Sequence, residues 1–318
     1  MMSRIAALVI GEALVDIVRT ANDVHHYPGG SCANVAVALA RLGRPTLLAT
    51  RYGDDRLGRL LEKHLAGSGV VIRHGSRQGG GRTSTADAEI EPDGSATYRF
   101  DLTWDVALDD LEPAAHSVVH VGSIGAQLLP GADAVAAAVA ALRETAIISY
   151  DLNARPALFG EPSAARERVA RLVASSDLAK ASDEDLAWLY PNMSIEEAAA
   201  TWLDLGAAAV LVTRAGNGAR VFTSRERVDV AGVPVEVVDT IGAGDTFSAA
   251  VIDGLWSSGL VGAENRERLR DLASPQWRQI AEYAVLAAGI AVSRPGADPP
   301  RAHELPPKPS LEAVPHVT

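Results

Sequence analysis

The chain has 318 residues, with 29 Lys and Arg against 40 Asp and Glu, so its formal net charge is −11. Hydrophobic residues make up 47% and charged residues 22%, which is ordinary for a globular protein and excludes a disordered or fibrous chain. The acidic balance argues against nucleic acid or an anionic membrane as a partner, and an anionic substrate would need a local positive pocket.

The cysteine count and the first residues favour a cytoplasmic protein. Cys32 is the sole cysteine, so no intramolecular disulfide can form, which fits a reducing compartment. Residues 1–17 carry Arg4, Glu12 and Asp16, and they lack the basic start, apolar core and cleavage site of a signal peptide. No apolar run reaches the roughly 18 residues of a membrane span, so no membrane partner is expected.

Apolar runs that stop at turn residues alternate with Ala- and Leu-rich stretches of helical length along most of the chain. We expect strands at 5–10, 14–18, 118–121, 146–150, near 178, 208–212, 220–223, 227–230 and 235–238. We expect helices at 31–42, 54–66, 132–143, 166–174, 195–205, 243–256 and 277–292. This alternation predicts an α/β fold with a mostly parallel sheet that helices cover on both faces.

Two segments depart from this alternation. Residues 85–91 and 96–102 alternate polar and apolar side chains around a turn at 92–94, which predicts a hairpin in a small antiparallel sheet apart from the main core. Prolines crowd the chain after Arg294 and predict an irregular tail at about 295–318. We therefore expect a single domain over the whole length, with these two additions.

The segment 239–247 joins the expected strand at 235–238 to a long Ala-rich helix, and it reads Asp-Thr-Ile-Gly-Ala-Gly-Asp-Thr-Phe. Glycines at a helix N-terminus let backbone N–H groups approach a phosphate, and the helix dipole favours the negative charge. Asp245 in the first turn could then accept a proton from an attacking hydroxyl group while the backbone holds the transferred phosphoryl group. The alternative is that Asp245 only complements the helix dipole and that the glycines only form a turn.

A second glycine turn precedes the expected helix at 31–42, where residues 29–34 read Gly-Gly-Ser-Cys-Ala-Asn. The Asn34 amide lies in the first helical turn, and Asp16 lies on a nearby expected strand. Carboxylate and amide groups together offer the acceptors and donors that several sugar hydroxyl groups require. The alternative is that Ser31 caps the helix and Asn34 faces solvent.

These segments resemble the ribokinase-like carbohydrate kinases, the PfkB family, over residues 11–297. The resemblance depends on two signatures: Gly29-Gly30 with Asn34 and a Leu-Gly pair at 42–43, and then residues 239–245. The second signature is specific, and the two occur in the order and separation of the family. The implied fold is ribokinase-like.

By this resemblance, Asp245 is the catalytic base, and the amide groups of Gly242, Ala243 and Gly244 form the anion hole for the transferred phosphoryl group. The residues expected to hold the sugar are Asp16, Gly29, Gly30 and Asn34. The small sheet, about 12–28 and 83–103, would be the family's lid, which covers the sugar, excludes water and often forms a homodimer.

Residues 151–159 resemble the Asp-x-Asn-x-Arg-x-x-Leu-Trp segment of fructokinases and 2-keto-3-deoxygluconate kinases. They follow an expected strand, at the edge where open α/β sheets bind ligands. The resemblance implies that Asn153 and Arg155 bind substrate, with Arg155 holding the transferred phosphate or an acidic group of the substrate. A surface salt bridge is the alternative for Arg155.

The resemblance also implies metal ions. Residues 180–185 take the place of the family's Asn-x-x-Glu motif, which organises Mg²⁺ through water, with Ser182 for Asn and the shorter Asp185 for Glu. Asp185 is therefore the residue expected to contact Mg²⁺ through water. Asp239 and nearby carbonyl groups would hold a monovalent cation such as K⁺, as in several relatives.

The nucleotide side is expected at residues 213–218, which resemble the family's Thr-Leu-Gly-x-x-Gly loop. Thr213, Gly216 and Gly218 are the residues expected to bind ATP. Ala215 stands in place of the first family glycine, so we expect a slightly reshaped loop.

The expected activity is ATP-dependent phosphorylation of a small sugar, most like that of a fructokinase. A 2-keto-3-deoxygluconate kinase is the alternative within the family, because Tyr98 and Arg99 on the lid hairpin resemble the groups that bind the carboxylate of that substrate. A non-catalytic sugar-binding protein on the same fold is the alternative from another class. The intact glycines and Asp245 argue against it.

Overall fold

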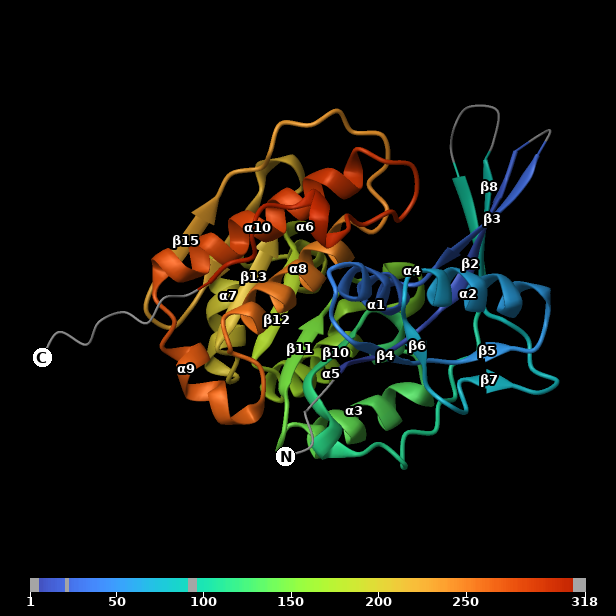
Figure 1. Cartoon of the computed structure of the whole chain (residues 1–318), viewed down its shortest axis with the longest axis horizontal. Helices are drawn as coiled ribbons and strands as arrows, with labels where there is room; N and C mark the ends of the chain where they lie inside the picture. Colours follow the sequence, from blue (N-terminus) through green and yellow to red (C-terminus); the bar gives the residue numbers. More distant parts are fainter. Residues whose placement is uncertain (1–5, 21–22, 91–95, 311–318) are drawn as a thin grey trace, which may run out of the picture.

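The computed structural model describes residues 6–20, 23–90 and 96–310, with the backbone alone for 90 and 96–98. A nine-stranded sheet lies at its centre (Figure 1), in the order β15-β14-β13-β12-β11-β10-β1-β4-β6. Its strands are β1 (Ala6–Ile10), β4 (Thr46–Ala49), β6 (Val71–Ile72), β10 (His116–Gly122), β11 (Ile147–Asp151), β12 (Leu178–Ser182), β13 (Ala209–Thr213), β14 (Ala219–Phe222) and β15 (Arg227–Val230). Neighbours from β13 to β6 pair parallel, and β13 to β15 pair antiparallel, which confirms the mostly parallel sheet.

Helices cover both faces of this sheet, as predicted. One face carries α3 (Gly131–Leu142), α5 (Pro162–Ala174), α6 (Asp183–Leu189) and α7 (Ile195–Asp204). The other carries α1 (Ser31–Arg41), α2 (Arg56–Gly67), α8 (Ala243–Ser257) and α10 (Ser274–Val292), and the shorter helices are α4 (Pro156–Phe159) and α9 (Arg266–Arg270). In β1, Leu8 and Ile10 pack with the first group and Ala7 and Val9 with the second, because successive side chains of a strand point to opposite faces. Among the described residues, no helix combines the length and apolarity that spanning a membrane requires.

A second sheet of four strands projects from the main one, at the upper right of Figure 1. Its order is β3-β2-β8-β9, with β2 (Leu14–Arg19), β3 (Val24–Gly29), β8 (Thr85–Ile90) and β9 (Ala96–Asp101). The β2–β3 and β8–β9 pairs are antiparallel, as predicted, and a parallel pairing of β2 with β8 joins the two hairpins. Arg19 Nε, 2.8 Å from Asp87 Oδ1, supports this junction. The turn expected at 92–94 lies outside the described residues.

The strand expected at 235–238 is wrong. These residues form no strand in the structure, and Val237 and Val238 are 61% and 55% exposed. The backbone N–H groups of Val238 and Asp239 both donate to the carbonyl oxygen of Val292 at the end of α10. The β-branched residues that suggested a strand therefore lie beside the C-terminal end of α10 and have no neighbouring strand to pair with. β propensity expresses itself only where such a neighbouring strand is present.

The tail after residue 294 is largely irregular in its described part, and a buried carboxylate anchors it to the core. Asp253 of α8 has no exposed surface. Its side chain accepts hydrogen bonds from Arg44, from Tyr283 Oη at 2.8 Å and from Lys308 Nζ at 2.8 Å. The tail residue Lys308 thus supplies part of the counter-charge that a buried carboxylate needs.

We predict that Asp253→Ala lowers the free energy of unfolding by about 3–5 kcal/mol, because it leaves Arg44 and Lys308 without their buried counter-charge. Urea unfolding followed by tryptophan fluorescence measures the loss. Lys308→Met is the matched control: its side chain is 30% exposed and Asp253 keeps Arg44, so we expect a loss of about 1 kcal/mol or less. A larger loss for Lys308→Met than for Asp253→Ala would contradict this account.

Candidate active site

The candidate site lies at the carboxyl edge of the main sheet, beside β1. This strand pairs with β4 on one side and β10 on the other. The chain adds β4 and β6 on the first side and later β10 and β11 on the second, so the strand order reverses at β1. Open α/β sheets bind ligands at such a point, outside the carboxyl ends of the strands. The N-termini of α1 and α8 meet the loops after β1, β10 and β11 there, through side-chain hydrogen bonds.

Asp245, in the first turn of α8, is 5% exposed and lies where these elements meet. Its Oδ1 accepts a hydrogen bond from Ser31 Oγ at 2.7 Å, and its Oδ2 accepts one from Asn34 Nδ2 at 2.8 Å. Asn153 Nδ2 lies 2.8 Å from Ser31 Oγ and 3.4 Å from Asp245 Oδ1. The structure thus brings together predicted site residues from three distant parts of the sequence.

The surroundings of Asp245 make it a stronger base than an exposed carboxylate. Burial raises its pKa, while hydrogen bonds from Ser31 and Asn34 and the charges of Lys180 and Arg155 oppose the rise. A carboxylate with a raised pKa is better suited to take a proton from a hydroxyl group. A carboxylate that only complemented the helix dipole would need neither the burial nor these donors.

Residues 242–244 form the glycine turn that leads into α8 and are partly exposed. Gly242, the N-cap, has φ +75°, a left-handed conformation that favours glycine. The N–H group of Thr246 makes the first helical hydrogen bond, to Gly242 O, so the N–H groups of Gly244 and Asp245 precede the helical ladder. A helix N-terminus of this kind is an anion-binding element.

The predicted sugar side is built around Asp16 on β2 and the glycine turn before α1. A Cβ on Gly29 would lie 2.2 Å from Asp16 Oδ2, so a glycine leaves the room that this carboxylate occupies. Gly30 has φ +102°, and a Cβ there would lie 2.6 Å from Glu12 O. Burial raises the pKa of Asp16 to about 6, against the lowering effect of the Arg155 charge.

The loop after β11 carries Asn153 and Arg155. Asn153 has φ +35°, a left-handed conformation in which Asn is enriched. Arg155 Nη1 donates to Asn153 Oδ1 at 2.7 Å and to the carbonyl oxygens of Asn153 and Ala154. The guanidinium group is thus held by its own loop rather than by a surface salt bridge, and its charge lowers the pKa values of Asp16 and Asp245.

Asp185 and Asp239, the residues expected near metal ions, both hold backbone groups. Asp185 Oδ1 accepts the N–H group of Ala154 and its Oδ2 that of Ser182, both at 2.8 Å. The two oxygens of Asp239 accept one backbone N–H group each, both at 2.9 Å. The described residues contain no group of three or more His, Cys, Asp or Glu side chains that could hold a metal ion. The metal roles of these carboxylates therefore stay predictions.

The loop after β13 carries the residues expected at the nucleotide. Thr213 ends the strand, Gly216 is exposed, and Gly218 has φ +84° with room for no side chain, since a Cβ would lie 2.1 Å from Val230 O. Ala215 has φ +45°, so an alanine adopts a left-handed conformation at this turn. Because β12 alone separates β13 from β11, this loop lies at the same sheet edge as Asn153.

For Tyr98, a predicted site residue, the structure describes the backbone alone. Its backbone lies on β9, opposite Ala88 of β8, which places it on the small sheet. Its side chain lies outside the described residues. The neighbouring Arg99 is exposed.

The sequence analysis missed roles for Ser31, Glu12 and Lys180. Ser31 is the first residue of α1 and donates to Asp245, so the alternative that it caps this helix is wrong; the N-cap is Gly30. Glu12 is 4% exposed and accepts the backbone N–H groups of Ser31 and Gly125, at 2.9 and 2.8 Å, and burial raises its pKa to about 7. Lys180 is buried on β12. For Glu12 and Lys180, the available signal was a charged residue within an apolar strand or shortly after one.

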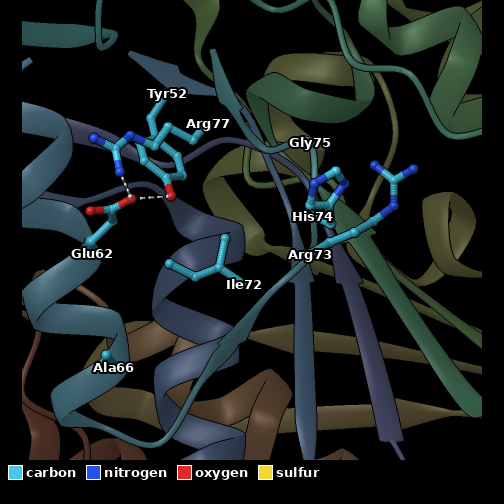
Figure 2. A pocket seen from close by; sticks show the side chains of 8 residues that line it. All are labelled: Tyr52, Glu62, Ala66, Ile72, Arg73, His74, Gly75 and Arg77. Carbon is cyan, nitrogen blue, oxygen red and sulfur yellow. Dashed lines mark hydrogen bonds and ion pairs between the residues drawn. The ribbon is translucent and has the colours of Figure 1, made fainter. Parts of the chain in front are cut away.

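A surface hollow of about 550 Å³ lies elsewhere, between α2 and the short pair of β5 (Tyr52–Gly53) and β7 (Arg77–Gln78) (Figure 2). Glu62 accepts a hydrogen bond from Tyr52 Oη at 2.8 Å and pairs with Arg77 at 3.6 Å. These polar groups satisfy one another, and the hollow shares no residue with the two glycine turns. We therefore assign the site to the glycine turns.

Comparison with known proteins identifies a family for the chain as a whole. The model of the pfkB family carbohydrate kinases matches residues 5–304. A fructokinase of Rhizobium leguminosarum bv. trifolii is 32% identical over 286 residues, which cover 85% of this chain and 87% of the relative. A probable fructokinase-2 of Arabidopsis thaliana is 31% identical over 306 residues, which cover 91% of this chain and 90% of the relative.

Solved structures of similar proteins confirm the ribokinase-like α/β fold. A fructokinase double mutant from Vibrio cholerae O395, with fructose, ADP and potassium ion bound, is 28% identical with a TM-score of 0.73, covering 93% of this chain and 94% of the other. A fructokinase from Xylella fastidiosa with bound ATP has a TM-score of 0.81 at 24% identity, covering 96% of this chain and 95% of the other. The chain belongs to the pfkB family of carbohydrate kinases.

Proposed function

We propose that this carbohydrate kinase transfers the γ-phosphoryl group of ATP to a hydroxyl group of fructose. The observation that carries the proposal is the buried Asp245 carboxylate, held by Ser31 and Asn34 directly after a glycine turn. Phosphoryl transfer to a hydroxyl group requires a base beside an anion-binding element, and this site has both. The fructokinases among the relatives support the choice of sugar.

Asp245 acts as the general base in this mechanism. Each of its oxygens accepts a hydrogen bond from the protein, and a carboxylate oxygen has a second lone pair that can accept the substrate hydroxyl proton. Ser31 and Asn34 fix the plane of the carboxylate during the proton transfer. Because the transition state of phosphoryl transfer is loose, the proton leaves late and a base of moderate strength is sufficient.

The amide groups of Gly242, Ala243 and Gly244 hold the oxygens of the transferred phosphoryl group, and the dipole of α8 adds to their attraction. Arg155 adds a positive charge that acts on both Asp16 and Asp245. Mg²⁺ bound with the phosphates of ATP would neutralise part of their charge, and Asp185 would contact it through water. The nucleotide itself is held by Thr213, Gly216 and Gly218, and Asp239 is the residue proposed for K⁺.

The sugar side favours a neutral sugar over a sugar acid. Asp16, Asn34 and Asn153 supply acceptors and donors for hydroxyl groups, and Gly29 and Gly30 keep the backbone close to them. Burial already raises the pKa of Asp16 to about 6, so a substrate carboxylate would add a further negative charge that this site disfavours.

In this proposal the small sheet is the lid over the sugar, with Tyr98 among its contacts, and the chain acts as one domain. The outer strand of this sheet, β3, exposes the side chains of Val24 (47%) and Tyr27 (49%), which supports an interface between two copies.

We place the protein in the cytoplasm, with no nucleic-acid or membrane partner. Its acidic net charge and its single, buried thiol group, Cys32, support this.

We predict that Asp245→Asn lowers kcat with fructose and ATP by about 10²–10⁴-fold, because it removes the proton acceptor. Fructose binding, measured by calorimetry, should change by less than about threefold. Asp204→Asn, an exposed carboxylate at the end of α7, is the matched control and should keep kcat. Near-normal turnover of Asp245→Asn would sink the mechanism.

We predict a preference for fructose of more than about 100-fold in kcat/KM over ribose, 2-keto-3-deoxygluconate and adenosine. This corresponds to ~2.7 kcal/mol of transition-state discrimination. An assay that couples ADP formation to NADH oxidation measures all of these substrates under the same conditions. Preference for the sugar acid would instead support the 2-keto-3-deoxygluconate kinase, and binding of fructose without turnover would support the non-catalytic protein.

A further inference from the structure

A buried ion pair lies under the glycine turn of the site. Lys180 Nζ on β12 is 2.8 Å from Asp151 Oδ2 on β11, and the two side chains are 8% and 0% exposed. Ser248 Oγ of α8 donates to the same oxygen at 3.2 Å. Taking two charges out of water costs about as much as their attraction returns, so stability alone is a weak reason for such a pair.

The position of the ammonium group points to a role in the site. A Cβ on Gly244 would lie 2.8 Å from Lys180 Nζ, so the ammonium group contacts the backbone of the turn and leaves room for a glycine there. Lys180 therefore places a positive charge next to the glycine turn, at Gly244. The carboxylate of Asp151, which pairs with that charge, has no exposed surface.

The same charge acts on Asp245. The groups that interact with Asp245 electrostatically are Lys180 on β12, Arg155 after β11, Asp151 on β11 and the Cys32 thiol group on α1. The two cations lower the pKa of Asp245, and burial raises it. Arg155 is partly exposed and screened by water, whereas Lys180 is buried, where charges interact more strongly.

We propose that Lys180 is a positioning residue for phosphoryl transfer, whose buried ammonium group keeps Asp245 ionised and strengthens the amide groups of residues 242–244 as an anion hole. The proposal rests on the function proposed above. It assigns Asp151, whose Oδ2 accepts a hydrogen bond from Lys180 Nζ, the separate role of holding the ammonium group in place.

The pH dependence of kcat/KM distinguishes this role from a structural one. Lys180→Met removes the positive charge, so the pKa of Asp245 rises and the acid limb of the profile moves to higher pH, by about one unit, with kcat about 10–100-fold lower. Asp151→Asn removes the negative partner, so the acid limb moves to lower pH or stays. Both variants break the same buried pair and both lose stability. A structural pair would give no shift, or a shift of the same sign in both variants, and either result would overturn the proposal.

The double variant Lys180→Met/Asp151→Asn covers the case in which Lys180→Met does not fold. It removes both charges, so no buried charge is left unpaired and urea unfolding should show recovery of most of the lost stability. Its kcat should stay at least about tenfold below the wild-type value. Recovery of wild-type kcat together with stability would refute the role of Lys180.

Failure of this proposal is separable from failure of the proposed function. Wild-type turnover of fructose and its loss in Asp245→Asn test the function without reference to Lys180. If those results hold and the Lys180→Met profile matches the wild-type profile, the kinase assignment stands and the role of Lys180 falls.

Discussion

The N-termini of α1 and α8 converge on one buried carboxylate, and the rest of the site depends on this arrangement. Asp245 accepts hydrogen bonds from Ser31 and Asn34, which lie 214 and 211 residues before it in the sequence. The two helices pack against each other on one face of the main sheet, and this packing brings their first turns together. The turn expected to hold the sugar and the turn expected to hold the phosphate are consequently joined through a single side chain. Movement of either turn alone would break a hydrogen bond to the proposed base.

The close approach of these turns explains why glycine stands where it does. The Asp16 carboxylate occupies the position that a Cβ on residue 29 would take, and the Lys180 ammonium group does the same at residue 244. In both cases a charged side chain from a strand fills the volume that a Cβ would need. An alanine at Gly244 would have to displace an ammonium group that Asp151 holds by a 2.8 Å hydrogen bond, which is costly in a close-packed interior. These glycines therefore serve packing of charged groups as much as backbone conformation.

The sequence predicted the fold well because strands and helices that alternate at this spacing allow few topologies. It placed Asn34, Asn153 and Asp245 in one site only through family resemblance, and it did not predict their hydrogen bonds, since periodicity carries no information on contacts across 90 or more residues. The alternative that Ser31 caps α1 stood because hydroxyl residues after a glycine turn commonly serve that purpose, and it is wrong, since the N-cap is Gly30. Asp185 shows the reverse case: Ser182 and Asp185 form a capping box, a local signal that the metal prediction overlooked. Local rules describe the turns, whereas the partners of each side chain depend on the assembled sheet.

The net charge of −11 places the proposed phosphate site in an unfavourable overall field, and the structure meets this locally. Three carboxyl groups around it, those of Glu12, Asp151 and Asp245, are buried, and burial raises their pKa values, so this interior disfavours added negative charge. Screening in water shortens the reach of the surface charges to about 10 Å, whereas charges in the interior are screened much less. An anion at the glycine turn therefore responds mainly to the groups next to it. These include the oriented N–H groups of α8 and the Lys180 ammonium group, which are positive, and the proposed base Asp245, which is negative until it takes up the proton.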